Sequence, residues 1–251
     1  MKSNYNELIK DLYSEPNLYI NEFKNYKDDI YFWQKIINNY NSKKVLEIGI
    51  GNGRLIELLH DKVKEYDGVD FSKEIIDYCN KKNNYENVKL YNSDFKNFSI
   101  NKKYDLIIFP FNVINNFYNK DDINLCFNSL KNLCNKNTKI VIDTINPTMS
   151  ELLDTDDYVK TNEFNLDNNK IEIYENKQFD IINLTCIYKK KYICNGEVIK
   201  EYILPNRIFF HQELLTIFDV YGFEIICLYG DYNLEKFNKS SRKQIFILRR
   251  K

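Results

Sequence analysis

The sequence predicts an α/β protein with a mostly parallel seven-stranded sheet, helices on both faces, and an antiparallel β-insertion after strand five. Three observations support this fold class. Between residues 43 and 143, short apolar runs alternate with segments of helical spacing, as in parallel strands joined by crossover helices. From about residue 158 to 210 the period falls to two, which is typical of antiparallel strands. A helix and two strands then return before the end of the chain.

The first half of the chain supplies five predicted strands with helices between them. These strands are Lys43–Gly49, whose end breaks into glycines, Tyr66–Asp70, Val88–Tyr91, Tyr104–Phe109 and Lys139–Asp143. The intervening helices are Arg54–Leu59, Lys73–Asn80 and Asp121–Leu133. The fourth strand is nearly all apolar, which indicates burial on both faces of the sheet.

The insertion and the two ends complete the predicted plan. Turn signals at Asp167-Asn168-Asn169 and Asn195-Gly196 separate the strands Lys170–Lys177, Ile181–Ile193 and Val198–Leu204. The helix Gln212–Tyr221, ended by Gly222, precedes the strands Phe223–Tyr229 and Lys243–Arg249, and two further helices are expected near Asn6–Tyr13 and Asp28–Tyr40. The expected divisions are an N-terminal pair of helices (1–41) covering the ligand site, an α/β domain (42–154 and 210–251), and the insertion (155–209).

Composition narrows the class of protein. The chain has 251 residues, and 36 Lys and Arg balance 36 Asp and Glu, so bulk charge does not predict nucleic-acid binding. No apolar run approaches the ~20 residues that span a bilayer, and the N-terminus lacks the apolar core of a signal peptide. The six cysteines form no C-x-x-C pair or zinc pattern. We expect a reduced, cytoplasmic protein with no membrane segment and no metal.

A glycine turn after the first strand is the strongest chemical motif. Glu47-Ile48-Gly49-Ile50-Gly51-Asn52-Gly53 opens a helix, and glycines there allow a ligand to approach the main chain. The dinucleotide pattern G-x-G-x-x-G fails because Arg54 stands at the third glycine position. Asp70 ends the second strand and Asp94 follows the third, so both carboxylates lie at the edge where ligands bind in open α/β sheets. The first carboxylate suits a ribose diol, and the second an adenine amino group.

In this arrangement the sequence resembles the class I S-adenosylmethionine-dependent methyltransferases, which have a Rossmann-like fold. The matching segments are 45–55, 68–72, 92–95 and 104–108, and the ending at 207–214, 221–225 and 229–232 is similar to the same family. The whole pattern is commonest in its small-molecule branch, which includes sugar N,N-dimethyltransferases and glycine N-methyltransferase-like enzymes and carries a β-insertion after strand five.

The resemblance implies S-adenosylmethionine as the cofactor and assigns its contacts. Gly49 and Gly51 would hold the methionine moiety, Asp70 the ribose, and Asp94 with Phe95 the adenine. Arg54 would pair with the methionine carboxylate, or else be a solvated surface charge. Tyr13 and Trp33 would close over the cofactor, with a core anchor as the alternative for Trp33. The remaining implied cofactor contacts are Glu47, Phe71 and Phe111.

The acceptor side is less specified, because a sulfonium is already activated and the enzyme mainly supplies proximity and alignment. Asn112 and Asn116 follow the fourth strand and are candidates to orient an acceptor, and His211 is a candidate to reach it. The predicted function is methyl transfer to nitrogen or oxygen of a small molecule by a monomer or homodimer. The alternatives are an RNA or protein methyltransferase and a non-catalytic cofactor-binding module. The insertion would cover the acceptor or form a dimer contact.

Overall fold

The computed structural model describes residues 5, 8–9, 13, 15–82 and 84–251, which form two compact units. The larger unit comprises Lys27–Asn146 and Phe209–Lys251, and the smaller comprises Met1–Tyr26 and Pro147–Ile208. Residues 27–41 therefore group with the α/β unit, whereas the sequence placed them with the N-terminal helices. The roles expected of the three sequence divisions stay predictions.

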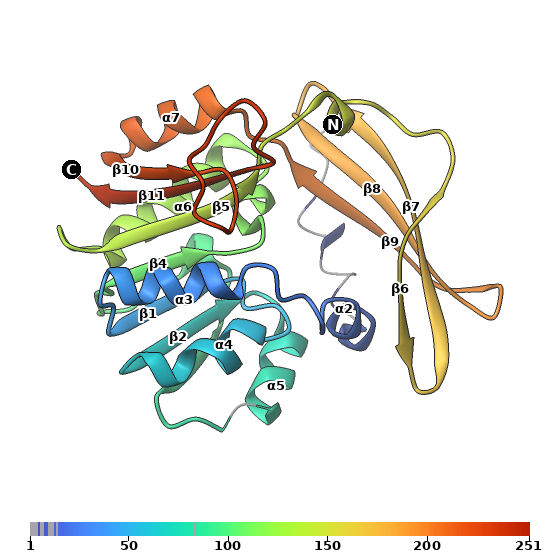
Figure 1. Ribbon diagram of the computed structural model, residues 1–251, viewed down its shortest axis with the longest axis horizontal. Helices are drawn as coiled ribbons and strands as arrows, with labels where there is room; N and C mark the ends of the chain where they lie inside the picture. The colour runs from blue at the N-terminus through green and yellow to red at the C-terminus, as the bar shows by residue number, and fades with distance from the viewer. Residues whose placement is uncertain (1–4, 6–7, 10–12, 14, 83) are drawn as a thin grey trace. The chain divides into compact units, whose positions relative to one another are not determined.

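The larger unit contains the predicted seven-stranded sheet, drawn in Figure 1. Its strand order is β10-β11-β5-β4-β1-β2-β3, and every neighbouring pair is parallel except those that involve β11. The strands are β1 (Lys44–Ile48), β2 (Glu65–Asp70), β3 (Val88–Asn92), β4 (Leu106–Phe109), β5 (Lys139–Ile145), β10 (Phe223–Tyr229) and β11 (Lys243–Arg250). The predicted fold class, including the antiparallel strands after β5, is confirmed.

Helices cover both faces of this sheet. The helices are α3 (Ile30–Asn39), α4 (Arg54–Leu59), α5 (Lys73–Lys82), α6 (Lys120–Leu133) and α7 (His211–Val220), with short 3₁₀ turns η1 (His60–Lys62), η2 (Phe95–Asn97) and η3 (Val113–Asn116). The apolar sides of α6 and α7 share one core with alternate strand residues such as Leu46, Ile107 and Ile140. The alternating residues of the same strands, such as Val45, Ile108 and Val141, point to the opposite face and are also buried, so that face is covered as well.

The N-terminal segment differs in part from its prediction. The second expected helix, 28–40, is present as α3. The first, 6–13, falls largely on residues outside those described. A helix that the sequence analysis did not predict, α2 (Pro16–Glu22), follows it. Pro16 at its first position was an available signal, because proline suits the first turn of a helix.

The smaller unit is a four-stranded antiparallel sheet in the order β6-β7-β8-β9. The strands are β6 (Val159–Leu166), β7 (Asn169–Asp180), β8 (Thr185–Cys194) and β9 (Glu197–Arg207), preceded by the 3₁₀ turn η4 (Met149–Leu152). The hairpin turns at 167–168 and 195–196 lie where the sequence predicted them, with the positive φ angles that such turns need. Leu18 of α2 packs with Ile171, Ile173, Tyr192 and Tyr202 of the sheet.

One predicted strand boundary is wrong. The sequence extended the β8 strand back to Ile181, but residues 181–184 form the turn between β7 and β8. The Asp180 carboxylate accepts hydrogen bonds from the backbone N–H groups of Ile182 and Asn183, at 3.0 and 3.1 Å. This side-chain capping favours a turn over an extended strand. Ile181 and Ile182 are exposed as a result, at 74% and 88%.

A buried ion pair joins α2 to the four-stranded sheet. Lys190 lies within a run of three lysines on β8, yet its side chain is only 5% exposed. Its Nζ donates to Oε1 of Glu22 at 2.5 Å and lies 3.2 Å from Glu175, while the Tyr192 hydroxyl donates to Oε2 of Glu22 at 2.5 Å. Four polar groups thus satisfy one another beneath the helix. Within the described part of the chain, no helix is long and apolar enough to cross a membrane.

This ion pair generates a stability prediction. Lys190→Met should lower the free energy of unfolding by about 3–5 kcal/mol, because it leaves the Glu22 carboxylate buried without its cation. The double variant Lys190→Met/Glu22→Leu should recover much of that loss. Urea unfolding followed by circular dichroism measures both effects. The control is Lys191→Met, since Lys191 pairs with an exposed Glu201 and should cost less than about 0.5 kcal/mol. Equal costs for the two lysines would contradict the buried pair.

Candidate active site

The predicted ligand residues of the larger unit gather at one edge of its sheet. Glu47 and the glycine turn end β1, Asp70 ends β2, Asp94 follows β3, and Phe111 follows β4. These four strands are neighbours and run parallel, so their carboxyl ends share that edge. The sheet topology therefore assembles residues that are up to 64 positions apart in the sequence, from Glu47 to Phe111.

Gly49, the first glycine of the turn, lies where a side chain would not fit. Gly49, Gly51 and Gly53 have φ angles of +70°, +51° and +72°, in the left-handed region that favours glycine. A Cβ atom on Gly49 would lie 2.7 Å from Cγ2 of Val113. The loop after β4 thus rests directly on the turn after β1, which brings the predicted cofactor and acceptor segments into contact.

Asp70 is held by the backbone of this turn and of its own loop. Its carboxylate is buried and accepts hydrogen bonds from the N–H groups of Gly51, at 3.3 Å, and Ser72, at 3.0 Å. Burial raises the pKa of Asp70 to about 6, and these backbone hydrogen bonds oppose part of the rise. Asp70 is therefore a desolvated hydrogen-bond acceptor beside the glycine turn, and its assignment to a ribose stays a prediction.

Glu47 is a second desolvated acid, on the preceding strand. It is buried, and the Tyr66 hydroxyl donates to its Oε2 at 2.8 Å. Burial raises its pKa to about 8, while the Tyr66 hydrogen bond and the nearby Arg54 act in the opposite direction. Near pH 7 the carboxyl group is thus largely protonated, and a cationic ligand group beside it would favour its ionisation.

Arg54 is not a solvated surface charge. Its guanidinium makes a bidentate pair with the buried Asp29, with N–O distances of 2.5 and 2.6 Å. The Trp33 indole donates to the same carboxylate at 2.9 Å, and its side chain is 1% exposed, which agrees with the core-anchor alternative. The Arg54 Cζ atom lies 5.7 Å from the centroid of the Phe111 ring. Asp29 thus fixes the arginine that reaches the loop after β4.

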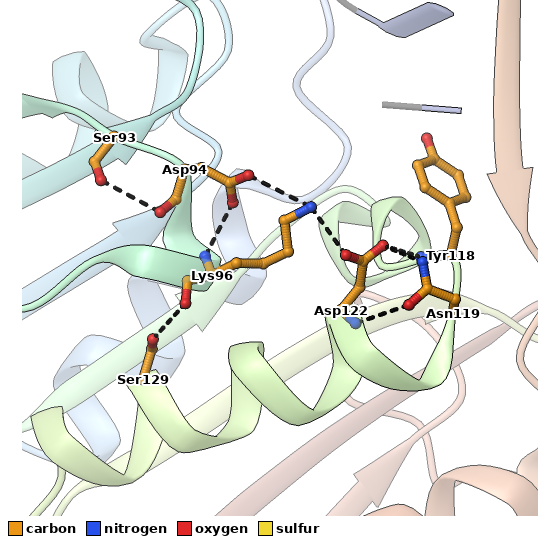
Figure 2. Close-up of polar contacts among 7 residues, drawn as sticks. All are labelled: Ser93, Asp94, Lys96, Tyr118, Asn119, Asp122 and Ser129. Atoms are coloured by element: carbon orange, nitrogen blue, oxygen red, sulfur yellow. Dashed lines mark hydrogen bonds and ion pairs between the residues drawn. The ribbon is translucent and has the colours of Figure 1, made fainter. Parts of the chain in front are cut away.

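The loop after β3 holds Asp94 and Phe95 in different ways. Asp94 is part of a charged network with Lys96 and Asp122, which Figure 2 shows. Phe95 is buried in the core, with its ring edge-to-face against Phe109 at a centroid distance of 5.5 Å. Phe71, from the end of β2, is half-buried, and its carbonyl oxygen accepts a hydrogen bond from the Asn92 side chain at 2.9 Å.

The loop after β4 begins with two residues in the left-handed region, Phe111 at φ +51° and Asn112 at φ +63°. A bulky residue rarely adopts this conformation, and its persistence requires support from the surrounding structure. Asp143 of β5 gives that support: its Oδ2 accepts from the Phe111 N–H at 2.9 Å, and its carbonyl oxygen accepts from the Asn112 N–H at 3.2 Å. The Asn112 Oδ1 atom is buried with no hydrogen-bond partner among the described residues. The loop after β4 thus carries one buried hydrogen-bond acceptor without a donor among the described residues.

Asp143 itself is fully buried and paired. Its Oδ1 lies 2.8 Å from Nζ of Lys243, and its Oδ2 also accepts from the Tyr232 hydroxyl at 2.6 Å. Lys243 begins β11, and Tyr232 lies in the loop before it. One carboxylate therefore connects the strained turn after β4 to the end of the chain.

The other two acceptor candidates occupy separate surroundings. Asn116 accepts from the Tyr118 hydroxyl at 3.4 Å. His211 begins α7, stacks on Phe237, and has Nδ1 2.9 Å from Oε1 of Gln244. Because the Gln244 amide nitrogen donates to two backbone carbonyls, its oxygen faces His211, so Nδ1 carries the proton in the neutral ring. The His211 Nε2 atom then keeps its lone pair.

Tyr13 belongs to the smaller unit, where its ring packs edge-to-face on Tyr19 at 5.1 Å. The other predicted site residues all belong to the larger unit. The assignment of Tyr13 as a cofactor contact stays a prediction.

Three supporting carboxylates escaped the sequence analysis: Asp29, Asp122 and Asp143. Asp143 carried a local signal, since it is the one charge directly after the apolar run Ile140-Val141-Ile142, and Asp122 carried another, since it stands three residues after the helix cap Asn119. The ion-pair partners of Asp29 and Asp122, Arg54 and Lys96, are 25 and 26 residues away in the sequence, and no periodicity predicts such pairs. Among the described residues, no group of three or more His, Cys, Asp or Glu side chains could bind a metal ion.

A known family matches most of this unit. The model of a family described as "Methyltransferase domain" matches residues 39–175, which is more than half of the chain. No protein with a curated description matches the sequence.

Several solved structures share the fold. The CcbJ methyltransferase from Streptomyces caelestis is 19% identical, with a TM-score of 0.77 over 100% of this chain and 99% of its own. An S-adenosylmethionine-dependent methyltransferase from Clostridium acetobutylicum is 19% identical, with a TM-score of 0.76 over 98% and 99%. The sugar N-methyltransferase KedS8 from Streptoalloteichus sp. is 12% identical, with a TM-score of 0.73 over 94% and 92%. The similarity in each case covers both units.

The raised pKa of Asp70 makes stability depend on pH. A carboxyl whose pKa is about 6 in the folded protein and 3.8 when exposed destabilises the fold as pH rises from about 4 to 6. The advantage of Asp70→Asn over the parent protein should therefore grow by about 3 kcal/mol across that window and stay constant above it. Urea unfolding of both proteins from pH 3.5 to 8 measures this difference. Parallel pH curves would contradict a desolvated Asp70.

Proposed function

This chain belongs to the methyltransferase domain family, and we propose that it transfers the methyl group of S-adenosylmethionine to a nitrogen or oxygen atom of a small molecule. The single observation that carries this proposal is the contact between the turn after β1 and the loop after β4. A Cβ atom on Gly49 has no room against the Val113 side chain, so the two segments are in direct contact. A methyl donor on the first segment would face an acceptor on the second.

The proposed cofactor contacts follow the edge of the sheet. The backbone near Gly49 and Gly51 receives the methionine end, with the Glu47 carboxyl group available to its ammonium. Asp70 accepts from the ribose hydroxyls, and its existing hydrogen bonds from Gly51 and Ser72 fix the carboxylate for that contact. Asp94 accepts from the adenine amino group. Arg54 is already paired with Asp29, so we assign it to positioning the Phe111 ring rather than to binding the methionine carboxylate directly.

In-line displacement at the sulfonium needs alignment more than acid–base chemistry. The acceptor atom attacks the methyl carbon, and the electron pair of the carbon–sulfur bond leaves with sulfur. We assign Asn112 to orienting the acceptor: its Oδ1 atom is buried without a donor, and a change in the side-chain torsion would expose it to an N–H or O–H group of the acceptor. A neutral amine needs no base before attack, whereas a hydroxyl or an ammonium does. The His211 Nε2 lone pair is the base that we assign to the latter case.

Two observations bear on the acceptor: one favours a small amine, and the other disfavours nucleic acid. KedS8, which shares the fold, is named as a sugar N-methyltransferase. The chain carries no net charge, with 36 cationic and 36 anionic side chains, which does not favour nucleic acid as a substrate. The unpaired cysteines favour a reducing, cytoplasmic location.

The functional test is methyl transfer to a panel of amino sugars, hydroxylated sugars and short amines. Mass spectrometry should find the mass increment of one or two methyl groups on at least one amine, with one S-adenosylhomocysteine formed for each methyl group transferred. Methylation of RNA or protein in place of every small molecule on the panel would overturn the proposed acceptor class.

The glycine turn gives a direct prediction for cofactor binding. Gly51→Val should weaken S-adenosylhomocysteine binding by at least about a hundredfold in calorimetry, because a β-branched residue is strained at φ +51° and obstructs ligand approach to the main chain.

The matched control is Gly196→Val, since Gly196 also has a positive φ, +82°, but lies at a hairpin turn of the smaller unit with open space around it. It should suffer comparable backbone strain and retain affinity. If Gly51→Val binds S-adenosylhomocysteine as tightly as the parent protein, the site is not at this turn.

A further inference from the structure

The Asp94 carboxylate is held at both oxygens by one residue, Lys96. The Lys96 backbone N–H donates to Asp94 Oδ1 at 3.0 Å, and the Lys96 ammonium lies 3.4 Å from Asp94 Oδ2. These two contacts fix the plane of the carboxylate, as Figure 2 shows. The Asp94 side chain is still 44% exposed, so its remaining lone pairs are open to a ligand.

Lys96 in turn is attached to α6 at two points. Its Nζ lies 3.0 Å from Oδ1 of Asp122, and its carbonyl oxygen accepts a hydrogen bond from the Ser129 hydroxyl at 3.1 Å. The Lys96 side chain is 11% exposed and that of Asp122 is 10% exposed. Water therefore screens this ion pair little, and the ammonium has a defined position between two carboxylates.

Asp122 is immobilised by the start of its own helix. Its Oδ2 accepts from the Asn119 side chain at 3.0 Å and from the Tyr118 N–H at 3.3 Å, while Asn119 accepts from the Asp122 N–H at 3.0 Å. This reciprocal cap leaves Oδ1 directed at Lys96. The chain of contacts runs from the cap of α6 through Asp122 and Lys96 to Asp94.

From this network we propose that Lys96 is a positioning residue that makes the nucleoside site specific for adenine. The proposal rests on the proposed function, in which Asp94 accepts a hydrogen bond from the adenine amino group. Rotation of a carboxylate about its last torsion is otherwise weakly restricted. The Lys96 ammonium stops that rotation, so one Asp94 oxygen lone pair keeps a fixed direction. Recognition of the amino group is directional, whereas stacking and ribose contacts are not affected by this rotation.

The test compares two ligands that differ only at the purine 6-position. S-adenosylhomocysteine carries the amino group, and its 6-deamino analogue, with an unsubstituted purine base, carries hydrogen there and offers the Asp94 carboxylate no hydrogen-bond donor. Calorimetry on the parent protein should show a preference for the adenine ligand of about ten- to a hundredfold, as expected for a hydrogen bond to a charged acceptor. Lys96→Met should reduce this preference at least threefold. Lys96→Arg should retain it, since arginine keeps the cation between the two carboxylates.

The control is Lys120→Met, which removes the same charge from an exposed residue in the first turn of α6 and should leave the preference unchanged. Thermal unfolding checks that each variant is folded, and Lys96→Gln replaces Lys96→Met if the methionine variant is not. An equal loss of affinity for both ligands, or an unchanged preference, would overturn the role of Lys96. Failure of the parent protein to bind S-adenosylhomocysteine at all would instead overturn the proposed function, and this inference with it.

Discussion

The site depends on the contact between Gly49 and Val113, where the end of β1 has no room for a side chain. Two neighbouring parallel strands present their carboxyl ends here, and their loops must turn away without colliding. Left-handed glycines give β1 a turn compact enough for the β4 loop to lie on it. The segment predicted to hold a methyl donor and the segment predicted to hold an acceptor are thereby adjacent. A side chain at position 49 would be strained at φ +70° and would force the Val113 side chain to move.

Buried carboxylates then fix the groups around this contact. Asp29 holds Arg54, and Asp143 holds the Phe111–Asn112 turn, Tyr232 and Lys243. Each carboxylate is fully buried but has several donors, which offsets the cost of desolvation. Glu47 and Asp70 accept hydrogen bonds from neutral donors, and burial raises their pKa values to about 8 and about 6. A buried acid of this kind destabilises the fold when it is charged, and a bound group that donated to it would offset that cost.

The sequence predicted the strands and helices of the larger unit because period and glycine signals are local. It also identified the residues at the strand ends, since parallel topology alone places Glu47, Asp70 and Asp94 at one edge. It missed α2, whose proline signal was present, and it ran β8 into a turn that Asp180 caps. The roles of Asp29, Asp122 and Asp143 were not predicted either, because the cations that pair with them lie far away in the chain. Arg54 and Lys190 show the same limit: the residue type suggests a solvated charge, and only the fold shows the buried partner.

A crystal structure of the protein grown with S-adenosylhomocysteine would locate the cofactor site. We expect electron density for the homocysteine end on the turn between Gly49 and Gly51, with both ribose hydroxyls within hydrogen-bond distance of Asp70. We also expect the adenine amino group against Asp94 and the sulfur atom facing the loop that begins at Phe111. Density for the ligand at any other edge of the sheet, or a sulfur atom directed away from Asn112, would contradict this placement of the cofactor.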